Sequence, residues 1–464
     1  MRLTWAQPED LVPAEIAALR EQLTGAGSND ARDDEAALAA VEARWAEAGG
    51  STVLAPSGAS AEAAPPHLRA LARGLLAELH ELQRPSAIEP DEWDDIVTLL
   101  PHAADGAVAA PAFDRLHGAW LGRAAGCLLG KPVEKIPREG IEEIARATGN
   151  WPITGYFTAV GLPADISERW PWNRRSAPTS LVENIDGMPE DDDLNFPILA
   201  LDLLERHGDA LTTDQVAEAW LAALPAGRVF TAERAAYRNI LDARPVPETA
   251  THLNPFREWI GALIRADVHG WAHPGDARAA ARSAWIDARL SHTRNGLYGE
   301  MWAAALCSQA VVAGSVDEVL DAADTVVPPQ SRLAAAVRFG REKGQALASG
   351  ALTADAALDA LHDEFAGMHW VHTLNNAALT ACALQAYGDD FGAAVALAVA
   401  GGWDTDSVGA TVGSVVGALV GADGIPSAWT TPLRDRIATS MPGGAERSIH
   451  ELAARTLALS ETRA

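Results

Sequence analysis

The chain has 464 residues, of which 63 are acidic and 36 are basic, and its net charge is −27. This balance, without any cluster of Lys and Arg, argues against nucleic acid or an anionic membrane as a partner. The three cysteines are far apart among apolar neighbours, and the first residues contain no apolar signal core, so we expect a cytoplasmic protein with buried thiols.

The first 110 residues predict a helical region of their own. Apolar residues recur at helical spacing behind Pro13, which predicts that a helix begins there, and again between Leu68 and Leu82. A stretch rich in Ala, Pro, Gly and Ser between them has the composition of a linker. No residue pattern here indicates chemistry. We therefore divide the chain into a helical region, 1–110, of structural or regulatory role, and a second domain, 111–464.

Two later segments carry glycine at every fourth position. Each glycine costs a helix about 1 kcal/mol relative to alanine, so four on one face need a reason. The usual reason is the close approach of a second backbone, and the two helices are candidates to pack on each other. Arg123 in the first segment, and the short apolar run of the second, exclude membrane spans. The glycines are Gly118, Gly122, Gly126 and Gly130, then Gly409, Gly413, Gly417 and Gly421.

Pro132 ends the first glycine-rich helix and places Glu134 in the loop behind it. On position alone, an exposed loop carboxylate is the simpler interpretation, because loop residues are mostly solvated. The helical pattern then breaks down over residues 146–190, which contain Trp151, Trp170 and Trp172 among others. This aromatic content favours an ordered loop and makes the three tryptophans candidates to line a pocket.

Two groups of acids lie at the starts of apolar helices. Asp191, Asp192 and Asp193 precede one helix, and Gly401-Gly402-Trp403-Asp404-Thr405-Asp406-Ser407 precedes another. Acids at a helix start are consistent with N-capping, and consecutive aspartates either face solvent or share a cation. If the groups converge, they supply five carboxylates and a hydroxyl, oxygen ligands that suit Mg²⁺, Mn²⁺ or Ca²⁺ and are enough for two ions.

Three motifs then follow one another in a recognisable order. The run from Gly118 to Glu134 is similar to an opening glycine-rich motif, and Asp191–Leu194 to a Thr-Asp-Asp-Thr motif. Gly402–Ser407 is similar to a Gly-Gly-Asp-Thr-Asp-Thr motif with Trp403 inserted. Together they resemble the ADP-ribosylglycohydrolase family from about residue 113 to 440. Asp191 and Leu194 stand where that family has threonines, which indicates a divergent subgroup whose substrate need not be an ADP-ribosylated protein.

The resemblance implies an all-α fold with a binuclear metal site holding two Mg²⁺ ions, or Mn²⁺. It implies hydrolysis at the anomeric carbon of an ADP-ribosyl or related ribosyl compound by a metal-activated water. The implied catalytic residues are Glu134, Asp192 and Asp193, with Glu134 as acid/base or gate. The implied metal ligands are Asp191, Asp192, Asp193, Asp404, Asp406 and Ser407. Candidates for substrate contact are Gly130, His292, His372, Asn375, Asn376 and Trp403.

Other interpretations remain open on the sequence. The substrate could be a small N- or O-riboside without ADP, or the chain could be a non-catalytic ligand-binding member. An isoprenoid synthase is also all-α and Mg²⁺-dependent, but Asn195 occupies the last position of the DDxxD motif that it needs. A zinc site at His369 and His372 is disfavoured because no H-E-x-x-H arrangement or cysteine cluster accompanies them. The oligomeric state stays open.

Overall fold

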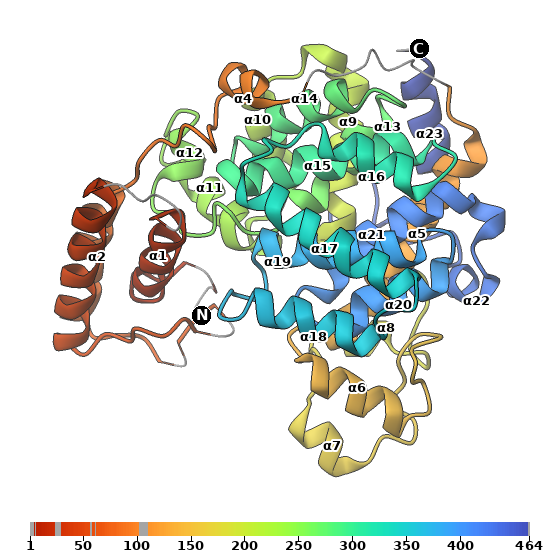
Figure 1. Cartoon of the computed structure of the whole chain (residues 1–464), viewed down its shortest axis with the longest axis horizontal. Helices are drawn as coiled ribbons and strands as arrows, with labels where there is room; N and C mark the ends of the chain where they lie inside the picture. The colour runs from red at the N-terminus through yellow and green to blue at the C-terminus, as the bar shows by residue number, and fades with distance from the viewer. Residues whose placement is uncertain are drawn as a thin grey trace.

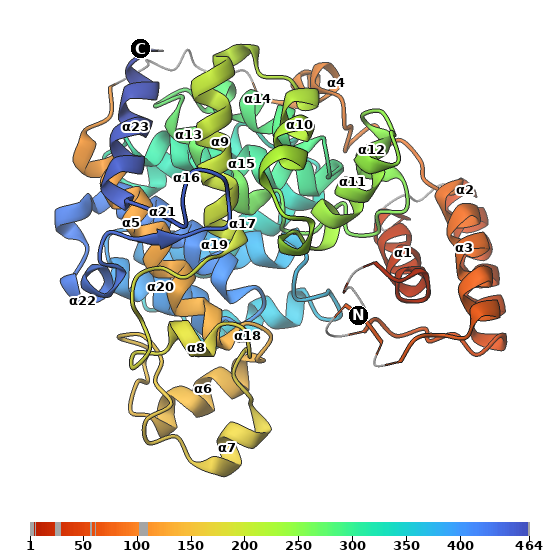
Figure 2. The same cartoon turned by 180° about the vertical axis from the view of Figure 1, so that it is seen from behind.

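The computed structural model describes residues 4, 6–23, 29–55, 58–60, 62–101 and 110–462, with the side chains of 29–32 left out. Within these residues the fold is all-α, as predicted. The only described strands are β1 (Ile437–Ala438) and β2 (Glu446–Arg447), which pair antiparallel. Figures 1 and 2 show a compact helical body, a group of N-terminal helices at one side, and a small lobe that projects from it.

The N-terminal helices are α1 (Pro8–Leu23), α2 (Asn29–Glu47), α3 (Pro66–His80) and α4 (Trp93–Leu99). The helices of the body and lobe are α5 (Phe113–Gly130), α6 (Arg138–Ala147), α7 (Ala164–Arg169), α8 (Ala177–Ser180), α9 (Asp192–His207), α10 (Thr213–Ala223), α11 (Thr231–Leu241), α12 (Glu248–Thr251), α13 (Asp267–Trp271), α14 (Ala277–Ala288), α15 (Arg294–Ala310), α16 (Val316–Asp324), α17 (Arg332–Ala348), α18 (Ala354–Glu364), α19 (Thr373–Tyr387), α20 (Phe391–Ala400), α21 (Thr405–Val420), α22 (Ser427–Thr430) and α23 (Ile449–Glu461). Short 3₁₀ segments are η1 (Lys131–Val133), η2 (Gly208–Ala210), η3 (Ala226–Arg228), η4 (Leu263–Arg265), η5 (Ala422–Gly424) and η6 (Thr431–Leu433).

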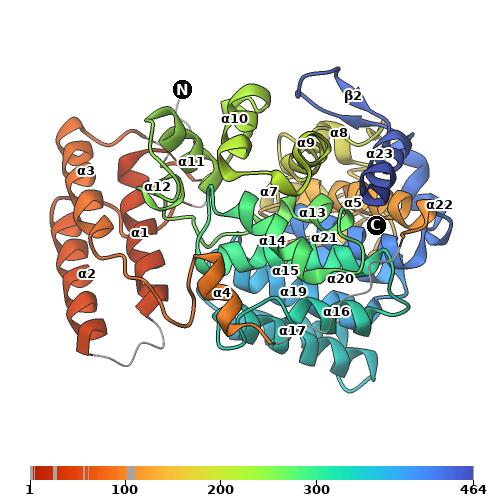
Figure 3. The ribbon, with the colours of Figure 1, turned by 90° about the horizontal axis from the view of Figure 1, so that it is seen from above.

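Helices α1, α2 and α3 lie side by side, as Figure 3 shows from above. The prediction that the first helix begins at Pro13 is wrong, because α1 begins at Pro8 and contains Pro13. Burial of Leu11 and Val12 outweighs the backbone hydrogen bond that Pro13 cannot donate.

Buried and partly buried ion pairs join the N-terminal region to the body. Arg257 donates to Glu15 at 3.0 Å, and both side chains are almost fully buried. Arg332 pairs with Glu89 at 2.9 Å. Removing one partner of such a pair strands a buried charge, so these contacts fix the N-terminal region in place. The division at residue 110 stays a prediction.

The two glycine-rich helices, α5 and α21, pack directly on each other at the centre of the body. A Cβ on Gly122 would lie 2.0 Å from the carbonyl oxygen of Gly413, and one on Gly126 would lie 1.9 Å from that of Gly409. The helices are therefore antiparallel and in backbone contact, which confirms the pairing that the spacing indicated.

This pairing brings the end of α5 against the start of α21. Thr405 donates its hydroxyl to the carbonyl of Gly130 at 2.9 Å, across 275 residues of chain. The loop behind α5, which carries Glu134, therefore lies beside Asp404 and Asp406. No described helix is both long and apolar enough to cross a bilayer.

Replacement of Gly122 by Ala tests the backbone contact. The added Cβ meets a backbone oxygen that cannot rotate away, so we expect Gly122→Ala to lower the free energy of unfolding by about 1–3 kcal/mol. Gly74→Ala is the control, because Gly74 is an exposed residue of α3 with nothing within 4 Å of an added Cβ. This change should raise the free energy of unfolding by about 0.5–1 kcal/mol. Urea unfolding measures both, and equal effects would contradict the close contact.

Candidate functional site

The first acid group lies at the start of α9. Asp191 caps this helix by accepting a hydrogen bond from the backbone N–H of Asp193 at 3.0 Å, so the capping interpretation is correct for this residue. Lys131 in η1 also pairs with the Asp191 carboxylate. Burial alone would raise the pKa of Asp191, but the Lys131 ammonium outweighs it and holds that pKa below its ordinary value.

Beneath this group lies Arg123, a fully buried arginine of α5. Its Nε donates to the backbone carbonyl of Asp193 at 2.7 Å, and its Nη1 lies 2.8 Å from Asp267. The guanidinium also lies 3.4 Å from the Asp193 carboxylate. Arg123 therefore anchors the start of α9 to the central helix pair, from inside the core.

The second group consists of Glu134, Asp404 and Asp406, whose carboxylate oxygens lie within 4.8 Å of one another. Asp404 precedes α21 but does not cap it with its side chain, and its backbone N–H donates to the Asn376 side chain at 3.2 Å. Glu134 accepts from the Asn173 amide at 2.5 Å and pairs with Lys135 at 3.1 Å. Its side chain is 18% exposed, so it is not the open loop acid that position alone suggested.

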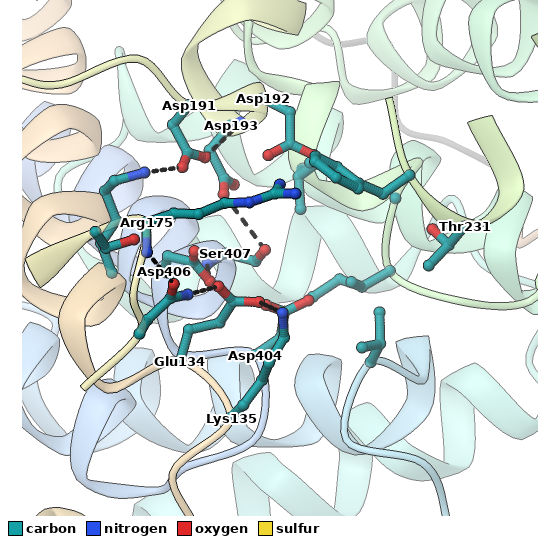
Figure 4. A pocket seen from close by; sticks show the side chains of 18 of the residues that line it. Glu134, Lys135, Arg175, Asp191, Asp192, Asp193, Thr231, Asp404, Asp406 and Ser407 are labelled. Carbon is teal, nitrogen blue, oxygen red and sulfur yellow. Dashed lines mark hydrogen bonds and ion pairs between the residues drawn. The ribbon is translucent and has the colours of Figure 1, made fainter. Parts of the chain in front are cut away.

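The two groups meet in one pocket, the acidic pocket, with a volume of about 420 Å³. Ser407 of α21 donates its hydroxyl to the Asp193 carboxylate at 3.4 Å and so links them. In Figure 4 the aspartates 191–193 face Glu134, Asp404 and Asp406 across the pocket, and the Arg175 side chain extends between the groups. The two acid groups therefore converge, which the sequence analysis stated only as a condition.

Burial and mutual repulsion oppose the charges on most of these acids. Burial is the largest cause, and neighbouring carboxylates the next, of pKa values well above the ordinary range for Asp192, Asp193 and Asp404. Burial and the Glu134 charge raise the pKa of Asp406 to about 7. The pocket therefore gathers carboxyl groups whose ionised forms the described cations around them only partly stabilise.

The donor atoms of the pocket fit a hard divalent cation. Carboxylate and hydroxyl oxygens are the ligands that Mg²⁺ and Mn²⁺ take, and a cation among them would relieve the repulsion. Cys127 also lies within 4.8 Å of Asp191 and Asp193. Burial raises the pKa of its thiol well above the ordinary value, and Cys127 does not line the acidic pocket. The donors that line the pocket are therefore oxygens, which favour a hard cation.

The six residues predicted to contact substrate lie outside the lining of the acidic pocket. His292 is buried 3.9 Å from Glu233, and His372 lies 2.8 Å from Glu21 of α1. Asn375 and Asn376 are fully buried, and Asn376 holds Asp404 as described above. Gly130 is packed against the backbone of Thr405, and Trp403 lines a neighbouring pocket. The buried side chains of His292, His372, Asn375 and Asn376 support the site from behind. Substrate contact by the six residues stays a prediction.

The three tryptophans of residues 146–190 do not line the acidic pocket either. Trp170 donates to Glu143 at 2.6 Å, and Trp172 contacts Phe157, so both pack within the lobe around α6 and α7. Trp151 lies under the Arg146 guanidinium there. The same segment instead contributes polar residues that the sequence interpretation missed, namely Asn173, Arg174, Arg175, Ser176 and Thr179.

Other pocket residues were missed because no motif marks them. Lys135 follows Glu134. Arg228 ends η3, Phe230 precedes α11 and Thr231 begins α11. Adjacent Arg174 and Arg175 are the one signal in the sequence that could have indicated an anion-binding edge. The pocket therefore has an acidic floor and a rim that carries arginines.

The start of α9 and the adjoining ends of α5 and α21 present two carboxylate groups to one pocket, which defines an all-α protein with an oxygen-ligand site. Comparison with known families then places it. The ADP-ribosylglycohydrolase family model matches residues 108–464, and the chain belongs to this family, whose members are glycosidases. This membership sets aside the isoprenoid-synthase alternative, and the match begins close to the predicted boundary at residue 110.

Among solved structures, the chain is similar to one described as an ADP-ribosylglycohydrolase-related protein complex. The identity is 23%, the match covers 76% of this chain and 99% of the other, and the TM-score is 0.46. Among curated proteins no significant match was found.

The buried arginine yields a prediction about stability. Arg123→Leu leaves Asp267 and Asp193 without their buried cation, so we expect a loss of about 3–5 kcal/mol in the free energy of unfolding. Arg146→Leu removes an exposed pair with Glu142 and should cost less than about 1 kcal/mol. Chemical denaturation without divalent cations compares the two. Similar losses for both variants would show that Arg123 is not the anchor of α9.

Proposed function

We propose that this glycosidase is a divalent-cation-dependent enzyme that hydrolyses the bond at the anomeric carbon of an ADP-ribosyl group. The observation that carries the proposal is the convergence of two buried carboxylate groups, joined through Ser407 and Asp193, in one pocket. Their like charges repel one another and lower the stability of the fold. Such an arrangement is typical of a site that binds a ligand or carries out a reaction.

In this proposal Asp192, Asp193, Asp404, Asp406 and Ser407 hold two Mg²⁺ or Mn²⁺ ions. Asp191 supports them from its cap and its pair with Lys131, which already occupy its carboxylate. Such ions, when bound, polarise ribose hydroxyls and lower the pKa of a bound water.

The residues of the chain supply the rest of the reaction. Water adds through its oxygen to the anomeric carbon, and the bond to the aglycone breaks. The aglycone leaves with the electron pair of that bond and takes up a proton. Glu134 accepts the proton of the attacking water and returns one to the aglycone, while Asn173 and Lys135 hold its carboxylate in position. The aspartates stabilise the positive charge that develops on the sugar ring.

The rim of the pocket supports a phosphorylated substrate. Arg175 reaches over the acids, with its guanidinium 5.6 Å from the Phe230 ring, and Arg174 lies beside it in the lining. A planar guanidinium binds phosphate oxygens in pairs, and the ADP-ribosyl group carries two phosphates. The arginines therefore favour an ADP-ribosyl compound over a simple riboside, which is the second candidate substrate.

Two substitutions separate the roles of the acids. Asp404→Asn should lose most activity and also weaken Mg²⁺ binding, because it removes a charge from the cation site. Glu134→Gln should lower kcat by about 100-fold or more, the range of general acid–base catalysis, with Mg²⁺ binding kept. Calorimetric Mg²⁺ titration and a release assay on ADP-ribosyl-arginine and ADP-ribosyl-serine measure both effects. Normal turnover by Glu134→Gln would contradict a role as acid/base and leave Glu134 only as a residue that lines the pocket.

Arg175→Ala tests whether the sugar part of the substrate carries phosphates. It should lower kcat/KM for ADP-ribosyl compounds by about 10- to 100-fold, the value of a charge-assisted hydrogen bond, while leaving simple ribosides unchanged. Arg169→Ala is the control, because Arg169 lies in the same segment but pairs with Glu143 outside the pocket. Equal effects of Arg175→Ala on both substrate types would argue for a riboside without phosphates.

A further inference from the structure

A second pocket adjoins the acidic one. It has a volume of about 1050 Å³ and carries four aromatic side chains, His362, His369, Trp370 and Trp403, so we call it the aromatic pocket. Lys135 and Trp370 line both pockets and form the partition between them. The Lys135 ammonium lies 5.5 Å above the Trp370 ring and 3.1 Å from the Glu134 carboxylate. The aromatic pocket therefore opens beside the residue that acts on the aglycone.

The rings of the aromatic pocket are held in fixed positions. His362 stacks on Trp403 with centroids 4.3 Å apart, and its Nε2 bonds the backbone carbonyl of Gly401 at 2.7 Å. His369 stacks on Trp259 at 4.3 Å with the ring planes within 11°. Pre-positioned rings lose little freedom when a flat ligand stacks on them, so the pocket is organised for such a ligand.

Two residues that line the aromatic pocket have unusual backbone conformations. Lys135 has φ of 73° and Trp403 has φ of 63°, both in the left-handed region that bulky residues rarely adopt. Each lies next to an acid of the site, Lys135 after Glu134 and Trp403 before Asp404. The unusual conformation lets each acid face the acidic pocket while its neighbour lines the aromatic one. Strain of this kind persists where the surrounding structure over-determines it, commonly at functional sites.

The N-terminal region also contributes to this pocket. Val53 and Leu54 line it, and Val53 is 74% exposed, although both precede the part of the chain that matches the family. An exposed apolar side chain at the edge of a pocket offers surface to an apolar ligand. The shape of the aromatic pocket is thus set partly by residues outside the family match.

The charges around the aromatic pocket argue against phosphate as its ligand. Arg138 is engaged by Asp355 at 3.2 Å and by Asp359. Four carboxylates line the pocket, namely Glu139, Glu142, Asp355 and Asp359, against the two cations Lys135 and Arg138. The phosphates of the substrate therefore belong on the Arg175 side of the acidic pocket, and a group without phosphate belongs here.

We propose that the aromatic pocket binds the aglycone of the substrate, and that this aglycone carries a planar aromatic ring. The inference rests on the proposed function, since it needs the ribose in the acidic pocket with its anomeric carbon toward Glu134 and the aromatic pocket. The ring of the aglycone contacts Trp370 and Trp403, which are partly exposed.

Two probes that differ only in flatness test the inference: the phenyl and cyclohexyl glycosides of ADP-ribose, each as both anomers. Their dissociation constants are measured by calorimetry on the full chain with EDTA present, and chromatography checks that no product forms. We expect the phenyl compound of one anomer to bind about fivefold tighter than the cyclohexyl one, the size of a favourable ring contact. In Trp370→Leu the ratio should fall to about one, and in Trp370→Phe it should persist.

Trp151→Leu is the matched control, because Trp151 lies in the lobe and lines neither pocket. It should leave the ratio unchanged. Equal binding of the two probes by the wild type, or a ratio that survives both Trp370→Leu and Trp403→Leu, would overturn the inference. If neither probe binds in EDTA, the titration is repeated on Glu134→Gln with Mg²⁺, and no binding there would overturn it as well. Turnover with Mg²⁺ is scored separately. If the wild type binds the phenyl compound more tightly but hydrolyses neither compound with Mg²⁺, the proposed function is contradicted and the assignment of the aromatic pocket is kept.

Discussion

The backbone contact between α5 and α21 is the constraint on which the site depends. Glycine at every fourth position lets the two helices approach until their backbones touch, as between Gly126 and Gly409. The contact fixes the antiparallel register, and with it the neighbours at one end of the pair. There the carbonyl of Gly130 meets Thr405, so the residues that follow α5 lie beside those that open α21. Any larger side chain along this seam would separate the helices and move the acids apart.

Repulsion among the carboxylates of the acidic pocket lowers the stability of the fold. Buried carboxylates face one another across the acidic pocket, and burial raises the pKa values of most of them. The cations nearby are committed, because Lys131 pairs with Asp191 and Arg123 is shared between Asp193 and Asp267. A protein retains such an arrangement at a cost to folding when the charges serve a ligand. The same repulsion that destabilises the fold prepares the pocket for a cation.

The N-terminal region contacts residues that support the acid site. Glu15 and Glu89 form buried or half-buried pairs with arginines of the body, and Glu21 contacts His372 just before α19. Asn376, in the first turn of α19, holds the backbone of Asp404. The N-terminal region therefore lies one helix turn away from a residue that positions the acid site, and it also supplies part of the wall of the aromatic pocket.

The sequence by itself determined the all-α class, the family and the two acid groups, because helical spacing and short motifs are local properties. It also indicated the α5–α21 pairing, since regular glycines have few other uses. Tertiary structure alone decided which polar residues face the pocket. His292 and Asn375 looked equally available in the sequence, yet both are buried behind the site, whereas Asn173 and Arg175 reach it from an irregular segment. Side-chain direction in loops depends on long-range packing, which no local pattern encodes.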